Sequence, residues 1–260
     1  MYLVEQTARV SCTHDPEEAL THLTVRGRWD GEARTQTARA LRGCVAETPR
    51  AVLADLSGLD DGAGDSAPTW QVASRFALES STPTRVIVCA APPPVRSRLT
   101  AATAVYPVAL ADTVADARYL LGPFTGWNHR FYRLRLPPEL GAVFAARTLA
   151  AEACLNYRLP HLIHHARLII SELATNAVEH SGSDFEVQVS VRGPVLHLAV
   201  QDRHPRPPRL IEAGPPGMPT LGPGYGLRVV AAAATSWGSL PCPEGKVVWA
   251  TLALEGSPAR

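Results

Sequence analysis

Three polar side chains that could do chemistry recur at four-residue intervals in the segment ISELATNAVEHSG. If this segment is helical, Glu172, Asn176 and His180 place a carboxylate, a carboxamide and an imidazole on successive turns of one face. These groups can accept protons or bind hard cations. On this stripe alone, the better interpretation is a partly exposed helix face whose Asn and His cap neighbouring backbone groups.

The elements around the stripe predict a layered domain. Ile169, Leu173 and Ala177 form an apolar arc beside the polar one, so a helix over residues 161–180 would hold the stripe at the border of a core. The other expected elements are a strand at 129–136, a helix at 139–157, strands at 185–193 and 195–203, a helix at 224–237 and a strand at 246–254. This order predicts an α/β sandwich with helices on one face of a mostly antiparallel sheet.

Two further segments strengthen a functional interpretation of the stripe. Asp202 ends an apolar strand, where its carboxylate can accept a hydrogen bond from an exocyclic amine. The segment GPGYGL places glycines directly before a helix, where backbone N–H groups can approach phosphate.

Taken in order, these motifs resemble a known ATP-binding fold. E-x-x-x-N-x-x-x-H, a strand ending in Asp, a loop ending in GxGL and a final strand are similar to the GHKL (Bergerat) fold. Within that group, ARLIISELATNAVEHSG, D-x-x-P-R-P-P and GKVVWATL resemble the anti-sigma factor serine kinases of actinobacterial type. The resemblance covers roughly residues 133–254.

The resemblance implies that the chain binds ATP and Mg²⁺. Asn176 would ligate Mg²⁺ through its carbonyl oxygen, and Glu172 would act as the catalytic base when the γ-phosphoryl group moves to a serine. Asp202 would accept a hydrogen bond from the adenine amine. The remaining nucleotide-binding residues are those of the glycine segment: Gly222, Gly224, Gly226 and Leu227.

The sequence departs from the family pattern after the adenine-binding position. DRHPRPP follows Asp202 where many members carry DxGxG, so a proline-rich turn replaces flexible backbone and nucleotide affinity could be lower. Lys246 stands where a threonine often begins the last strand, and we assign it no adenine contact. Residues 210–223 would form a lid over the nucleotide, and His180 would fix the end of its helix.

The first half of the chain predicts a separate α/β domain over residues 1–121. Apolar strands expected at 23–29, 51–59 and 85–92 alternate with helical patterns at 37–48, 69–80, 95–106 and 113–121. VLADLSGL followed by GDSAPTW resembles the STAS domain of anti-sigma factor antagonists. We therefore expect an STAS-like domain at 1–121, a linker at 122–132 and a GHKL domain at 133–260.

Ser66 is the candidate phosphorylation site of the STAS-like domain. STAS antagonists usually carry their serine in a DSSG-like segment, whereas here the loop DDGAGDSAP is about two residues longer and no glycine follows Ser66. We expect Ser66 to remain unmodified and, with Pro68, to begin a helix.

Composition narrows the compartment and the partners. The chain has 260 residues, of which 46% are apolar, and it carries 25 basic and 24 acidic side chains for a net charge of +1. This balance offers no large attraction to nucleic acid or to a membrane surface. Its five cysteines are scattered without a CxxC pair, and its apolar runs are too short to span a bilayer, so we expect a cytoplasmic protein.

These expectations combine into a partner-switching regulator. The resemblance implies a serine kinase that acts on an STAS anti-sigma factor antagonist, sequesters a sigma factor, or does both. The alternative is a partner-switching protein that holds nucleotide without turnover. The sequence leaves open the oligomeric state, with a homodimer as one alternative, and the identity of the partners.

Overall fold

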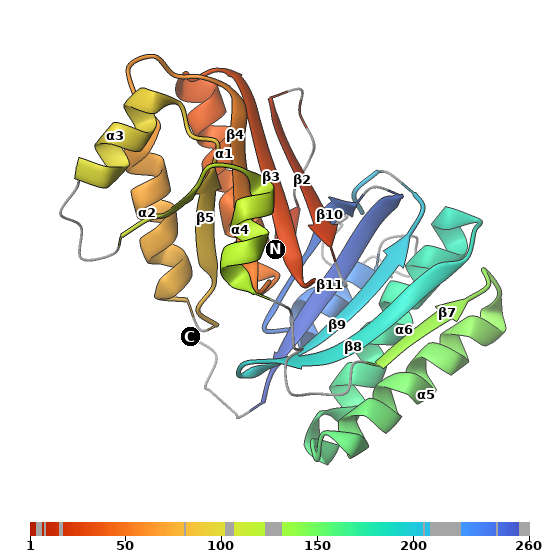
Figure 1. The fold of residues 1–260 in the computed structure, drawn as a ribbon. Coiled ribbons are helices and arrows are strands. Elements are labelled where there is room, and N and C mark those ends of the chain that lie inside the picture. The colour runs from red at the N-terminus through yellow and green to blue at the C-terminus, as the bar shows by residue number, and fades with distance from the viewer. Residues whose placement is uncertain are drawn as a thin grey trace, which may run out of the picture. The chain divides into compact units, whose positions relative to one another are not determined.

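The computed structural model describes residues 1–3, 7, 9–15, 18–80, 82–101, 107–122, 132–204, 206–208, 225–242 and 244–254. The chain divides into two compact units (Figure 1). The C-terminal unit comprises Met1–Leu3, Trp127–Ser239 and Pro243–Arg260, and the N-terminal unit comprises Val4–Gly126 and Leu240–Cys242. Most of the expected linker at 122–132 lies outside the described residues.

The described residues of the C-terminal unit form a sheet and three α-helices. Its described elements are β1 (Tyr2–Leu3), β7 (Tyr132–Leu136), α5 (Leu140–Asn156), the 3₁₀ helix η1 (Pro160–Leu162), α6 (Ile163–Ser181), β8 (Phe185–Arg192), β9 (Val195–Asp202), α7 (Gly226–Ala233), β11 (Gly245–Ala253) and β10 (Ser236–Cys242), of which Leu240–Cys242 are grouped with the N-terminal unit. Among these residues the strand order is β1-β10-β11-β9-β8-β7. The pairs β7–β8, β8–β9 and β9–β11 are antiparallel, whereas β1 pairs with β10 in parallel.

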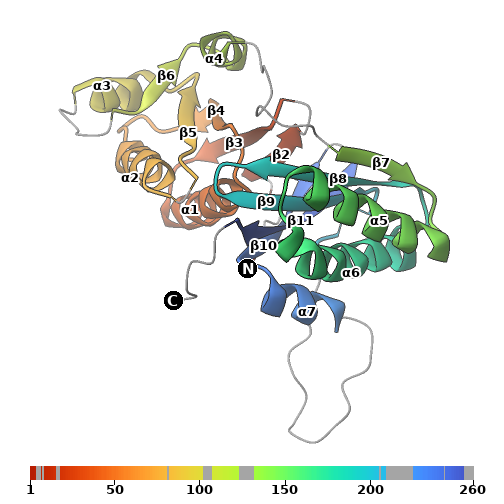
Figure 2. The ribbon, with the colours of Figure 1, turned by 90° about the horizontal axis from the view of Figure 1, so that it is seen from below.

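Apolar periodicity explains how these elements pack. Alternate residues of β8 and β9, such as Val187, Val189 and Leu198, share one sheet face and join a core with the inner faces of α5 and α6. Alanines on α5, including Ala146 and Ala150, let that helix approach α6 closely. Figure 2 shows α5 and α6 side by side along one face of this sheet.

The described residues of the N-terminal unit form a second sheet and four helices. Its described elements are β2 (Val10–Asp15), β3 (Leu20–Arg28), α1 (Gly31–Ala46), β4 (Ala51–Asp60), α2 (Ala67–Leu78), β5 (Arg85–Cys89), α3 (Pro93–Ala101), β6 (Ala109–Ala111) and α4 (Val114–Leu121). The strand order is β2-β3-β4-β5-β6, with β2 antiparallel to β3 and the other neighbours parallel. Side chains of α1, α2 and α3 pack on one sheet face, and α4 packs on the other.

The structure confirms the coarse class predicted from the sequence. Each unit is a sheet with packed helices; the N-terminal sheet is mixed and the C-terminal sheet is antiparallel apart from the short β1–β10 pair. The helix predicted over 224–237 is wrong beyond Ala233, because residues from Ser236 onward pair as strand β10. Within the described residues, no helix combines the length and apolar character needed to cross a bilayer.

Candidate functional site

Helix α6 presents the predicted stripe at the edge of the core. Ile169, Leu173 and Ala177 are buried against the sheet, whereas Glu172 and Asn176 are half-buried. Their four-residue spacing keeps them on one face beside the apolar arc. His180 is exposed in the last turn, and the helix stops at Gly182, whose φ of +60° suits glycine. The helix end therefore depends on Gly182 more than on a contact from His180.

Glu172 lies against Gly226, the first residue of α7. A Cβ atom at Gly226 would collide with Oε2 of Glu172 and would lie 3.4 Å from its Cδ. No other residue could stand at 226 without moving the carboxylate. The structure thus brings together two predicted site residues from different helices.

The surroundings of Glu172 change its acidity. Burial raises the pKa of its carboxyl group above the ordinary value, and the nearby negative charge of Glu179 raises it further. A carboxylate with a raised pKa is a stronger proton acceptor once it is ionised. Half-burial also leaves part of the group accessible to a reactant.

Asn176 has an unsatisfied polar atom. Its Nδ2 is buried and makes no hydrogen bond with a described residue. A buried amide group without a partner costs roughly 1 to 3 kcal/mol, so such an atom in a native fold calls for an explanation. A ligand that contacts the Asn176 carboxamide would supply one.

Asp202 is paired with Lys246 where β9 and β11 meet. The two residues are direct cross-strand neighbours, and Nζ of Lys246 donates to Oδ1 of Asp202 at 2.8 Å. Both side chains are almost completely buried, with exposures of 3% for Asp202 and 7% for Lys246. Asp202 shares its sheet face with Val200 and Leu198, which pack into the helix-covered core. The carboxylate therefore lies on the side that the nucleotide interpretation requires.

A close backbone approach fixes this pair. A Cβ at Gly245, the first residue of β11, would collide with the carbonyl oxygen of Asp202 and would lie 2.6 Å from Cα of Arg203. With φ at +154°, glycine lets β11 begin against the end of β9. The strand register then places Lys246 directly opposite Asp202.

The glycine segment is described only in part. Gly222 and Gly224, together with the expected lid at 210–223, lie outside the described residues. Leu227 is 2% exposed and packs in the core near α6, so its side chain anchors the start of α7. Within the described part of the segment, Gly226 is the residue whose backbone faces a candidate catalytic group.

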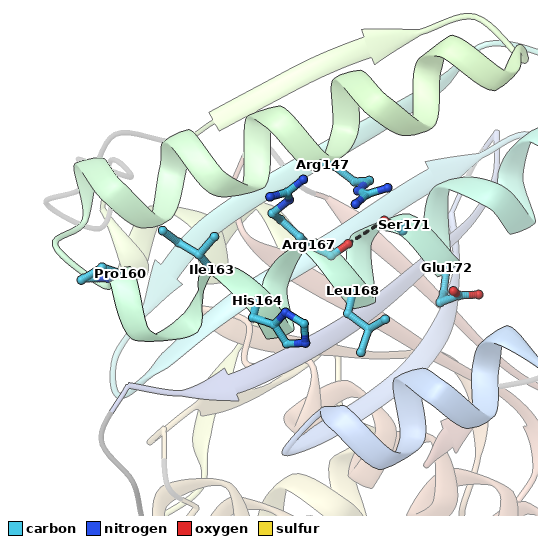
Figure 3. Close-up of a pocket in the computed structure, with 8 residues that line it drawn as sticks. All are labelled: Arg147, Pro160, Ile163, His164, Arg167, Leu168, Ser171 and Glu172. Carbon is cyan, nitrogen blue, oxygen red and sulfur yellow. Dashed lines mark hydrogen bonds between the residues drawn. The ribbon is translucent and has the colours of Figure 1, made fainter.

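A groove of about 570 Å³ leads along α6 to Glu172 (Figure 3). Pro160 lies at one end of the row of residues and Glu172 at the other. The described residues that line it are Arg147, Pro160, Ile163, His164, Arg167, Leu168, Ser171 and Glu172. Sequence reasoning missed this groove, although His164 and Leu168 continue the four-residue spacing backward from Glu172.

Ser66 is buried at the start of α2. Its backbone N–H donates to Oδ2 of Asp61 at 2.8 Å, and its hydroxyl oxygen accepts from Nε1 of Trp70 at 3.2 Å. Asp61 also accepts from the N–H of Asp65 at 2.9 Å, so Asp61 satisfies the backbone groups that precede the helix. The backbone hydrogen bonds lower the pKa of the Asp61 carboxyl group even though burial opposes them. Ser66 begins the helix as expected, but its side chain makes no capping bond.

Comparison with known proteins leaves the family unassigned. No protein-family model matches the chain, and a search of curated proteins finds no match. The assignment of function therefore depends on the residues themselves.

Proposed function

We propose that residues 133–254 form an ATP-binding domain of the GHKL type that acts as an anti-sigma factor serine kinase. The contact between Glu172 and Gly226 carries this proposal, because it joins the polar stripe of α6 to the glycine segment at the start of α7. The sheet with helices on one face is compatible with the same fold.

Three features of the described residues fit a magnesium nucleotide. The buried Nδ2 of Asn176 makes no hydrogen bond with a described residue, so it is free to donate to a phosphate oxygen while the carbonyl oxygen of the same carboxamide faces the metal. Gly226 begins α7 without a side chain, and its Cα side is occupied by the carboxylate of Glu172. Asp202 offers a carboxylate at the end of an apolar strand, on the helix side of the sheet. Asn176 would ligate Mg²⁺, Asp202 would bind the adenine amine, and Gly226 would approach phosphate.

Glu172 would act as the base in phosphoryl transfer. ATP supplies the γ-phosphoryl group and Mg²⁺ offsets its charge. Glu172 accepts the proton of a serine hydroxyl as the serine oxygen bonds to the γ-phosphorus and the bond to the β–γ bridging oxygen breaks, leaving ADP. The raised pKa of Glu172 favours this proton transfer near neutral pH.

The groove beside α6 would receive the protein that carries this serine. Arg147, Arg167 and His164 line it, so it favours a segment with acidic residues. Phe144 lies one turn before Arg147 on α5 and is 70% exposed, and aromatic side chains with arginine are typical of protein interfaces. We propose that the substrate is a separate STAS-type antagonist and that a sigma factor is a second partner.

The N-terminal unit would be an STAS-like module that contributes a binding surface without being phosphorylated. Its candidate serine is buried beneath Trp70 and Asp61, which leaves no access for a kinase in this conformation. We propose that this unit acts by occupying or exposing a partner surface.

A second candidate function is a nucleotide-binding partner switch without turnover. Either function places ATP in the same site, and they differ only in whether the phosphoryl group moves.

Incubation with ATP labelled at the γ-phosphate, alone and with candidate STAS antagonists, tests this proposal. A kinase transfers label to a serine of one antagonist, in a reaction that requires Mg²⁺. Tight MgATP binding with no transfer and no hydrolysis would support the partner switch. Absence of ATP binding would reject both candidates.

A further inference from the structure

The ion pair of Asp202 and Lys246 belongs to a hydrogen-bond network that also includes the backbone of His204. Nζ of Lys246 donates to Oδ1 of Asp202 at 2.8 Å and to the carbonyl oxygen of His204 at 3.1 Å. The backbone N–H of His204 donates to the same Oδ1 at 2.8 Å. The network therefore fixes the position of the ammonium group at the end of β9.

The bonding capacity of this network is not exhausted. An ammonium group has three N–H donors, and the described residues accept from two of those on Lys246. Among the described residues, both hydrogen bonds to the Asp202 carboxylate are accepted by Oδ1, so Oδ2 can still accept one from a ligand. A ligand could therefore accept a hydrogen bond from Nζ of Lys246 and donate one to Oδ2 of Asp202, whereas a carboxylate alone could only accept.

Adenine presents the complementary pair of groups. Its exocyclic amine is a donor, and the adjacent ring nitrogen is an acceptor. Guanine reverses this order, because a carbonyl oxygen replaces the amine and the adjacent ring nitrogen carries a proton. If the amine of adenine lies at Asp202, both the amine and the adjacent ring nitrogen meet complementary groups. If the carbonyl oxygen of guanine lies there instead, it meets an acceptor and the protonated ring nitrogen meets a donor, so both contacts are repulsive.

We propose that Lys246 is a specificity-determining residue that donates a hydrogen bond to the adenine ring nitrogen beside the amine, while Asp202 accepts from the amine. This inference rests on the proposed ATP-binding function, and it replaces the expectation from the sequence that Lys246 makes no adenine contact. It also explains why a lysine is buried at this position: its charge is balanced by Asp202, and its remaining donor serves the ligand.

The competing explanation is that the pair only closes the junction of β9 and β11. A buried ion pair needs good geometry and extra hydrogen bonds to offset desolvation, and the His204 contacts supply these without any ligand. In that case, Lys246 contributes to stability and not to the choice of base.

A nucleotide in which one ring nitrogen can no longer accept a hydrogen bond separates the two explanations. The probe is 1-deaza-ATP, in which carbon replaces the ring nitrogen, and its binding is compared with that of ATP by calorimetry. The parent protein should bind 1-deaza-ATP roughly tenfold more weakly, which corresponds to one net hydrogen bond. Lys246→Met should bind the two nucleotides equally. Arg203→Met removes a neighbouring exposed charge and should keep the parental discrimination.

Each outcome decides between the proposals. Equal affinity of the parent for ATP and 1-deaza-ATP would overturn the role of Lys246 while leaving ATP binding intact. Discrimination that survives in Lys246→Met would also overturn it. A parent that binds neither nucleotide would reject the proposed function and the inference together. If Lys246→Met fails to fold, the comparison made on the parent alone still decides.

Discussion

The carboxylate of Glu172 lies against the backbone of Gly226, in the space that a side chain at position 226 would fill. This contact joins the middle of α6 to the first residue of α7, and the strands β8 and β9 lie between these two helices in the sequence. It positions the candidate base beside the helix start at which phosphate would bind.

Gly226→Ala should displace the Glu172 carboxylate. The added methyl group collides with Oε2, and a shift of about 1 Å in a catalytic group can lower a rate by up to roughly 100-fold. Phosphate transfer should therefore fall by about 10- to 100-fold. Gly31→Ala is the matched control, because Gly31 also begins a helix and a Cβ there meets nothing within 4 Å. Transfer at the parental rate by Gly226→Ala would show that the contact has no catalytic role.

Asp202→Asn should weaken nucleotide binding. Asparagine can still accept from Lys246, but it no longer balances the buried ammonium charge and presents a poorer acceptor to the adenine amine. We expect a loss of roughly 1 to 3 kcal/mol in ATP binding free energy, measured by calorimetry, together with a lower melting temperature. Unchanged ATP affinity in a folded variant would remove Asp202 from the site.

The pH dependence of transfer should report the raised pKa of Glu172. The base must be ionised, so activity should be lost as pH falls, at a pH above that expected for an ordinary glutamate. Glu179→Gln removes one cause of the raised pKa, so the acidic limb should move to lower pH, although burial still holds it above the ordinary value. If the transfer activity of the parent instead fell at the pKa of an ordinary glutamate, Glu172 would not be the base.

The same raised pKa has a stability consequence with a defined sign. Because the folded state binds the Glu172 proton more tightly than the unfolded state, this group favours folding at low pH, and that contribution is lost as pH rises through the folded pKa. At neutral pH the ionised carboxylate opposes folding. Glu172→Gln should therefore be no less stable than the parent in thermal unfolding at pH 7.

Ser66 should carry no phosphate after incubation of the protein with MgATP. Its side chain is fully buried, and its hydroxyl oxygen accepts from Trp70. Phosphorylation would require this part of α2 to unfold. Intact-mass and peptide mass spectrometry should find the unmodified residue, and stoichiometric phosphate on Ser66 would overturn the structural explanation.

The local half of the site was predictable because it depends on helical and strand periodicity. Spacing alone placed Glu172 and Asn176 on one face of a helix, beside a buried arc that contains Leu173. On β8, the alternate residues Val187, Val189 and Val191 likewise lie on one face and join the core. Each of these features involves residues that lie close together in the sequence, so a local pattern is enough to predict it.

The other half depends on contacts between distant segments. The pairing of Lys246 with Asp202 follows from the register of β11 on β9, which no local pattern specifies. The edge strands β2, with six residues, and β6, with three, are absent from the strands expected from the sequence. The predicted helix ran too far into residues 234–237 because alanines favour helix, whereas tertiary pairing makes Ser236 the first residue of β10.

Asn176→Ala separates metal binding from catalysis. Removing the carboxamide removes the proposed Mg²⁺ ligand, so Mg²⁺-dependent ATP binding should weaken while ATP binding without Mg²⁺ changes little. The variant should also be folded, because the truncated group includes an unsatisfied buried nitrogen. Equal Mg²⁺ dependence in parent and variant, measured by calorimetry, would exclude the ligand role.

The rate of phosphate transfer by Glu172→Gln at saturating MgATP tests whether Glu172 is the base of a serine kinase. Glutamine keeps the shape of the side chain beside Gly226 but cannot accept the serine proton. Once the parent protein is shown to phosphorylate an antagonist, we expect Glu172→Gln to bind MgATP about as well as the parent does. Its transfer rate should be about 10²- to 10⁴-fold lower. A variant that transfers phosphate at the parental rate would contradict this role of Glu172.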